Sequence, residues 1–182
     1  MSDFQGCFNI DLKKPEQYCQ ALQQLVNEHP RLRKEMDRFY YTASLLAYAP
    51  DRDDRAALLN ELHEQIMAFS SHIESHSLKE EQHLFELMTR YIGKENGPLA
   101  VMEHEHQTAK EHMQLFFDKF PSVDKNHSES IRDLAHHASI IFHTLTDHFL
   151  KEEEILFPLA EKLLTVEEKK QLYDIFVSLK TA

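Results

Sequence analysis

The chain has 182 residues, 13 histidines and a formal net charge of −11 at pH 7. This length is sufficient for one domain with a substantial core. The excess of acidic side chains argues against a nucleic-acid partner, because phosphate binding needs a basic surface. No apolar run approaches about 18 residues, so no membrane span is expected. Two cysteines, Cys7 and Cys19, without a disulfide framework or a signal peptide indicate a cytoplasmic protein.

The sequence predicts an all-α fold, because it has only three glycines and its prolines fall mainly at the ends or bends of helical runs. We expect a single domain over residues 1–182. A short helix could begin at Pro15, and a first long helix runs past His29 to about Ala49. Pro30 is expected to kink this helix or divide it in two.

The second long helix is predicted from about residue 52 to residue 92, with Gly93 after its last turn. Asn96-Gly97-Pro98 forms the next turn, and a third helix ends at about Phe120. The fourth spans roughly residues 128–164.

A capping box, Thr165 to Glu168, begins a final helix at about 166–179. Four long helices joined by short loops predict an up-down four-helix bundle with short flanking helices, its core at about residues 15–164.

Two segments repeat one another: residues 76–87 and 148–159 are identical at eight of twelve positions. Each copy begins with a His-x-x-x-Glu motif, formed by His76 and Glu80 and by His148 and Glu152. Residues four apart lie on one helix face, so each motif directs an imidazole and a carboxylate to the same side. The duplication predicts two halves of a metal site.

A weaker repeat lies upstream, where Glu28-His29 and Glu105-His106 are each followed at the same spacing by Met and Phe. Each histidine therefore belongs to a core-facing stripe. Mixed nitrogen and oxygen ligands favour a pair of iron ions, with zinc or manganese as alternatives. The two glutamates could bridge the ions together with an oxide or hydroxide. The predicted ligands are His29, His76, Glu80, His106, His148 and Glu152.

These motifs give the chain a family resemblance. They read Ser75-His76-x-x-Lys79-Glu80-Glu81, Val101-Met102-Glu103-x-Glu105-His106, and Asp147-His148-x-x-x-Glu152 with Leu156-Phe157-Pro158. In them the chain resembles hemerythrin-like (HHE) domains, and in particular the di-iron proteins of that family that repair iron-sulfur clusters. The resemblance implies a non-haem di-iron centre with four histidines and two bridging glutamates.

The sequence departs from that family's oxygen carriers at Met102, where they have a further histidine ligand four residues before His106. The spacing from His148 to Glu152 is also one residue shorter than theirs. The residues before Pro15 are too few for the N-terminal cysteine domain of the repair proteins.

The resemblance implies that the centre binds or reacts with oxygen, nitric oxide or peroxide in nitrosative or oxidative stress, or in cluster repair. The alternative is a reversible oxygen or nitric oxide storage or sensing module without catalysis. A third hypothesis treats the metal as a structural staple of the bundle. No catalytic residue, redox partner or protein partner is assigned.

Other side chains receive weaker predictions. His72 and His104 could be spare ligands, outer partners of the ligands or surface residues. Glu81, Glu153 and Glu154 are expected to form a solvated acidic edge, with Glu153 as the substitute if Glu152 is not the bridge. The remaining histidines are given no role.

Overall fold

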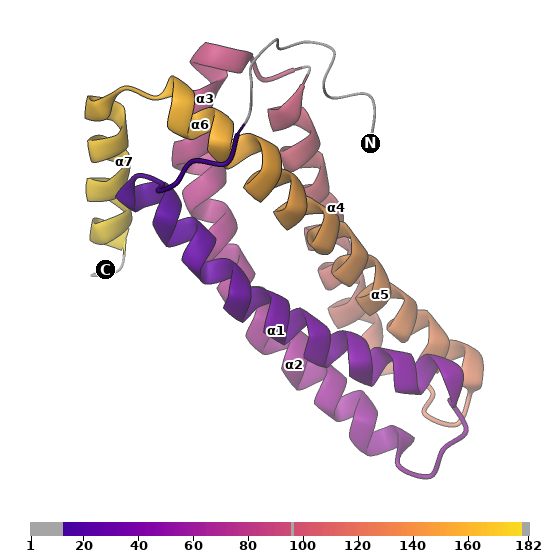
Figure 1. Ribbon diagram of the computed structural model, residues 1–182. Coiled ribbons are helices and arrows are strands. Elements are labelled where there is room, and N and C mark those ends of the chain that lie inside the picture. Colours follow the sequence, from indigo (N-terminus) through magenta and orange to yellow (C-terminus); the bar gives the residue numbers. More distant parts are fainter. Residues whose placement is uncertain (1–12, 96, 180–182) are drawn as a thin grey trace. The chain divides into compact units, whose positions relative to one another are not determined.

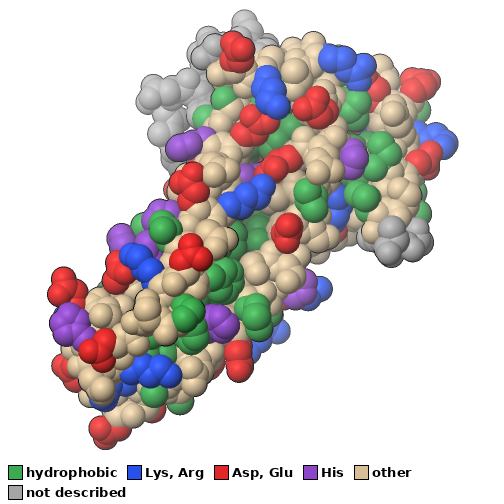
Figure 2. Space-filling view, turned by 180° about the vertical axis from the view of Figure 1, so that it is seen from behind, with side chains coloured by type: hydrophobic (Ala, Val, Ile, Leu, Met, Phe, Trp, Pro, Cys, Tyr) green, Lys and Arg blue, Asp and Glu red, His purple; other side chains and the backbone are tan. Residues whose placement is uncertain are grey.

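The computed structural model describes residues 13–95 and 97–179, and every regular element within these residues is a helix (Figure 1). The predicted all-α fold is therefore confirmed. Cys7 and Asn96, which entered the predictions above, lie outside the described residues. In the part of the chain that is described, no helix combines the length and apolar character needed to cross a membrane. Acidic and basic side chains are intermixed in the view of Figure 2.

The long helices follow the predicted order, with three irregular segments between them. The short helix expected at Pro15 is not formed, because residues 13–19 contain no regular element and the first helix begins at Gln20. The elements are α1 (Gln20–Tyr48), α2 (Arg55–Lys79), the π-helical η1 (Glu80–Leu84), α3 (Phe85–Ile92), α4 (Pro98–Lys119), the 3-10 turn η2 (Phe120–Ser122), α5 (Ser128–Lys151), the π-helical η3 (Glu152–Leu156), α6 (Phe157–Leu163) and α7 (Val166–Leu179).

The helix ends agree closely with the sequence patterns. Gly93 ends α3 with a positive φ of 73°, a conformation that glycine adopts without steric cost. The capping box before α7 is formed: the Glu168 backbone N–H donates to Thr165 Oγ1, and the Thr165 N–H donates to the Glu168 carboxylate. Pro30 does not divide α1, which continues through it as one helix.

The second and fourth long helices differ from prediction, because each contains a π-helical segment. The Phe85 backbone N–H donates to the Glu80 carbonyl, and Phe157 donates to Glu152, so the bonds skip five residues rather than four. Both segments begin at the glutamate of a His-x-x-x-Glu motif. The internal repeat therefore extends to this local backbone irregularity.

Proline does not cause the irregularity, because Pro158 follows only the second segment, whereas Glu86 occupies its place in the first. The spacing of the buried residues offers a better explanation. Consecutive buried positions lie four apart at His76, Glu80, Leu84, Met88 and Ile92. In a regular α-helix such a series drifts by about 40° per step. A wider turn corrects the drift and keeps the series facing the core.

The described residues divide into two compact units, with residues 13–29, 76–95, 97–104 and 148–179 in the first and residues 30–75 and 105–147 in the second. The first unit packs the start of α1 and α4 with α3, α6 and α7. Its core includes Leu22, Phe85, Met102, Phe157 and Phe176. This unit contains both π-helical segments. The prediction of a single domain stays a prediction.

The second unit packs the remaining parts of α1, α2, α4 and α5, which are connected in pairs by the loops at residues 49–54 and 120–127. Phe39 and Phe69 contact each other in its core, with ring centroids 5.2 Å apart. Tyr40 and Phe142 stack at 4.0 Å. Aromatic burial thus stabilises this unit independently of the predicted metal ligands.

Candidate metal centre

Five of the six predicted ligands converge inside the first unit. His29, His76, Glu80 and Glu152 each offer one ligand atom, and these atoms all lie within 4.8 Å of one another. Glu80 and Glu152 also meet this criterion together with His148. Two ligand atoms on one ion are at most about 4.2 Å apart when each bond is about 2.1 Å. Small movements would therefore allow either group to hold an ion.

The two inner carboxylates are fully buried, at 0% exposure. Glu80 Oε1 lies 3.3 Å from His76 Nε2. The Glu152 oxygens lie 3.3 Å from His29 Nε2 and 3.1 Å from His148 Nε2, yet neither oxygen accepts a hydrogen bond within the described part of the chain. A buried carboxylate in this state is costly unless a cation neutralises it. The donor set therefore fits a metal ion.

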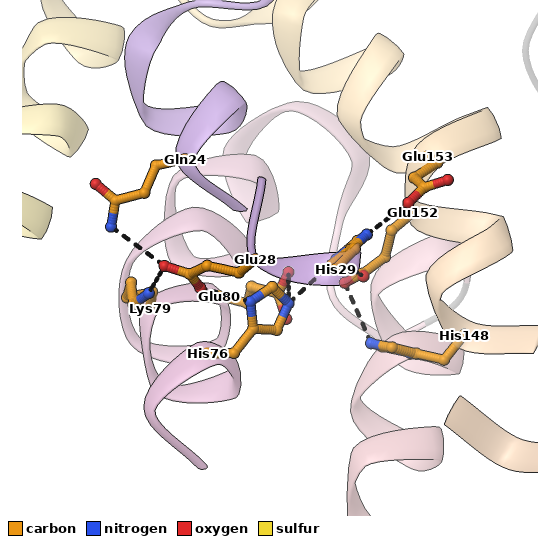
Figure 3. A network of polar contacts seen from close by, with 9 residues as sticks. All are labelled: Gln24, Glu28, His29, His76, Lys79, Glu80, His148, Glu152 and Glu153. Carbon is orange, nitrogen blue, oxygen red and sulfur yellow. Dashed lines mark hydrogen bonds and ion pairs between the residues drawn. The ribbon is translucent and has the colours of Figure 1, made fainter. Parts of the chain in front are cut away.

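Two further carboxylates contact the outer nitrogens of two predicted ligand histidines (Figure 3). His29 Nδ1 lies 2.7 Å from Glu153 Oε1, and His76 Nδ1 lies 2.8 Å from Glu28 Oε2. When each Nδ1–H donates to its carboxylate, the lone pair of Nε2 is left for the centre. The two Nε2 atoms are 3.3 Å apart. Metal-binding histidines are commonly oriented by such outer carboxylates.

Aromatic rings fix the same imidazoles and shield them from water. Phe149 stacks on His29 with centroids 4.4 Å apart, and Phe157 stacks on its ring at 5.7 Å. Phe149 also meets His76 edge-on at 5.9 Å and lies 5.8 Å from His148. These contacts limit ring rotation and make the surroundings apolar, which strengthens charge interactions at the centre.

The protonation of the histidines reflects the surrounding carboxylates. Burial alone would lower the pKa of His76, but Glu80 and Glu28 outweigh it and raise the pKa to about 10. Burial likewise opposes protonation of His29, whereas Glu152 and Glu153 raise its pKa overall. The nearby carboxylates thus favour the protonated form of both imidazoles in the metal-free protein. A divalent ion would displace those protons, since only neutral imidazole coordinates metal.

His106 is buried on α4 and belongs to the second unit. It lies four residues after Met102, a core residue of the first unit, and therefore on the same face of α4. His104 is exposed on that helix. His72 contacts Glu35 at 2.9 Å within the second unit, which favours a surface role among those predicted. The assignment of metal ligands stays a prediction for all six residues.

Sequence reasoning did not assign the outer carboxylates. Glu153 was expected on a solvated edge or as a substitute for Glu152, but it contacts His29 from a half-buried position. In the sequence Glu28 adjoins His29, but in the structure its carboxylate contacts His76. Both glutamates directly adjoin a predicted ligand in the sequence, and this adjacency was the available signal.

Comparison with known proteins agrees with this geometry. The family described as hemerythrin HHE cation binding domain matches residues 20–160. Over 102 residues the chain is 31% identical to the iron-sulfur cluster repair protein YtfE of Edwardsiella ictaluri (strain 93-146), covering 54% of the chain. The match spans 46% of that relative, so the chain corresponds to about half of its length. No solved structure matches the chain.

Proposed function

The chain belongs to the hemerythrin HHE cation-binding domain family, and from this premise we propose that it holds two iron ions which react with a small ligand. The ions would be bridged by Glu80 and Glu152 and by an oxide or hydroxide. The ligand would be oxygen, nitric oxide or peroxide. Iron is favoured over zinc because imidazole and carboxylate donors together suit a redox-active iron pair.

One observation carries the proposal: Glu80 and Glu152 are shared by both candidate ligand groups. A carboxylate has two oxygens and can contact two ions at once, whereas an imidazole nitrogen contacts one. Shared carboxylates between separate histidines are the donor arrangement of two-metal sites in helical bundles. A single structural ion would need only one of the two groups.

We propose His106 as the sixth ligand. The support is the upstream repeat, in which Glu105-His106 corresponds to Glu28-His29, together with the burial of His106. His106→Ala should reduce iron content, whereas His104→Ala should not, because His104 is exposed on the same helix. Equal iron content in both variants would remove His106 from the ligand set.

When bound, an iron pair supplies electrons and open coordination positions to a small ligand. The protein's own contribution is to orient the histidines through their Nδ1 contacts and to exclude bulk water with Phe149 and Phe157. Dry surroundings protect a reactive centre from side reactions.

The biological setting is proposed from the relative that is named as an iron-sulfur cluster repair protein. We propose a role in nitrosative or oxidative stress, with cluster repair as the specific task and the cytoplasm as the compartment.

The test is metal analysis of the purified protein combined with stopped-flow mixing of the reduced form with oxygen or nitric oxide. We expect two irons per chain and rapid oxidation by oxygen without a stable adduct. Met102→His, which introduces the histidine of the oxygen carriers, should lengthen the life of the oxygen adduct. A stable reversible complex in the unmodified protein would favour storage or sensing, and one inert zinc would favour the staple.

A further inference from the structure

Lys79 is a cation buried beside the candidate metal centre. It immediately precedes the inner ligand Glu80, and only 6% of its surface is exposed. Lysine is rarely buried to this extent unless its charge is paired. Its Nζ donates a hydrogen bond to Oε1 of Glu28, the carboxylate that also contacts His76 (Figure 3).

The two oxygens of Glu28 have different partners. Oε1 accepts a hydrogen bond from Lys79 Nζ and another, at 3.5 Å, from the side-chain amide of Gln24. Oε2 lies 2.8 Å from His76 Nδ1. This division fixes the plane of the carboxylate. Lys79 and His76 thus hold the Glu28 carboxylate from its two oxygens.

Without Lys79, the Glu28 side chain could turn toward solvent, because 28% of it is exposed. His76 would then lose the acceptor that holds its Nδ1–H outward and its Nε2 toward the centre. Lys79 therefore influences the orientation of His76 indirectly, through the Glu28 carboxylate that lies between them.

We propose that Lys79 is a positioning residue of the metal centre, which acts by holding Glu28 against His76. The proposal rests on the metal site of the proposed function. The proposal and simple electrostatics predict opposite changes in metal affinity when Lys79 is replaced by an uncharged residue. A lysine charge repels a bound cation, so removing only that charge should tighten metal binding. Loss of positioning should weaken it instead.

The experiment is titration of the metal-free protein with Co²⁺, followed by calorimetry and by the visible absorption of the bound ion. Lys79→Met should weaken binding by about tenfold, the lower limit for partners of metal ligands. Lys79→Arg should restore most of the affinity, because it keeps a donor for Glu28. Lys170→Met is the matched control, since Lys170 forms an exposed pair with Asp174 in the same unit.

A double-mutant cycle tests whether Lys79 acts through Glu28. Glu28→Gln alone should weaken binding, and adding Lys79→Met to it should cause no further loss. An equal loss in both backgrounds, or tighter binding in Lys79→Met alone, would overturn the proposal. If Lys79→Met does not fold, Lys79→Gln takes its place in the cycle. Failure of the unmodified protein to bind Co²⁺ would instead refute the metal centre itself.

Discussion

Each compact unit contains a pair of facing imidazoles, but the two pairs have opposite surroundings. In the first unit, His29 and His76 face each other through Nε2 and contact carboxylates through Nδ1. In the second, His112 and His137 face each other through Nδ1 at 2.9 Å, and the Lys119 ammonium lies 3.0 Å from His137 Nε2. The charged groups in direct contact with the rings are carboxylates in the first pair and an ammonium in the second.

The pKa shifts follow these surroundings. The pKa of His76 is raised, whereas burial and Lys119 lower that of His137, and burial and His136 lower that of His112. Because Lys119 donates to His137 Nε2, His137 carries its proton on Nδ1 and donates it to His112. No Nδ1 lone pair is left for a metal between them. Clustered histidines alone therefore do not indicate a metal site, and the carboxylates around them decide.

The largest expected effect is the loss of metal when an inner ligand is removed. His76→Ala, Glu80→Ala, His148→Ala and Glu152→Ala should each remove most of the bound metal, because the repeated motifs have equivalent roles. His137→Ala should leave metal content unchanged. The measurement is elemental analysis after purification in iron-supplemented medium. Full metal content in all four ligand variants would contradict the assignment of a metal site to the first pair.

The second largest effect is expected from metal removal, which should lower the melting temperature of the protein. The metal-free centre keeps Glu80 and Glu152 buried at 0% exposure, beside histidines that would coordinate a metal only in their neutral form. A ligand that binds only the folded state stabilises it by about 4 kcal/mol at 1,000 times its Kd. Calorimetric melting with and without metal measures this difference. The same melting temperature in both forms would mean that the centre does not need a cation.

A smaller effect is expected at the outer carboxylates. Glu153→Gln keeps an acceptor for His29 Nδ1 but removes the negative charge, and should weaken metal binding by about 10-fold to 100-fold. Glu154→Gln is the control, because that neighbouring side chain is exposed. Equilibrium titration with Co²⁺ compares the two. Equal affinities of the two variants for Co²⁺ would show that the negative charge of Glu153 does not contribute to metal binding by the first pair.

The second pair should determine part of the acid sensitivity. Since the pKa of His137 is lowered in the folded protein, the unfolded chain binds more protons below about pH 6.5, and acidification lowers the free energy of unfolding. His137→Asn should therefore lose less stability than the unmodified protein between about pH 7.5 and about pH 5.5. Urea unfolding of both metal-free proteins measures the loss. A greater loss of unfolding free energy in the variant would mean that folding raises, rather than lowers, the pKa of His137.

The smallest effect is expected at His127, whose exposed ring contacts only the nearby Ser130 hydroxyl among the contacts described. His127→Ala should change neither metal content nor melting temperature measurably. A change in metal content would show that a loop histidine outside both pairs influences the centre.

The sequence predicted the helices and the inner ligand candidates because helical periodicity and the internal repeat are local patterns. It could not predict the outer carboxylates, since Glu28 and Glu153 reach histidines 48 and 124 residues away. Such contacts depend on how helices pack. The sequence did not predict the π-helical segments for a different reason: the spacing of apolar positions indicates which residues face the core, but not that the turn between them widens.

The π-helical segments also determine how the chain tolerates changes in length. Each segment accommodates one residue more than a regular turn, and each begins at the glutamate of a His-x-x-x-Glu motif. Deleting one residue, such as Gln82, would remove the extra residue and allow a regular helix to form in its place. Phe85 and Met88 would keep their orientation toward the core, because the wider turn and the shortened regular turn direct the following residues to the same side. A one-residue gap at this position of an alignment would therefore mark the loss of the wider turn rather than a change in the core.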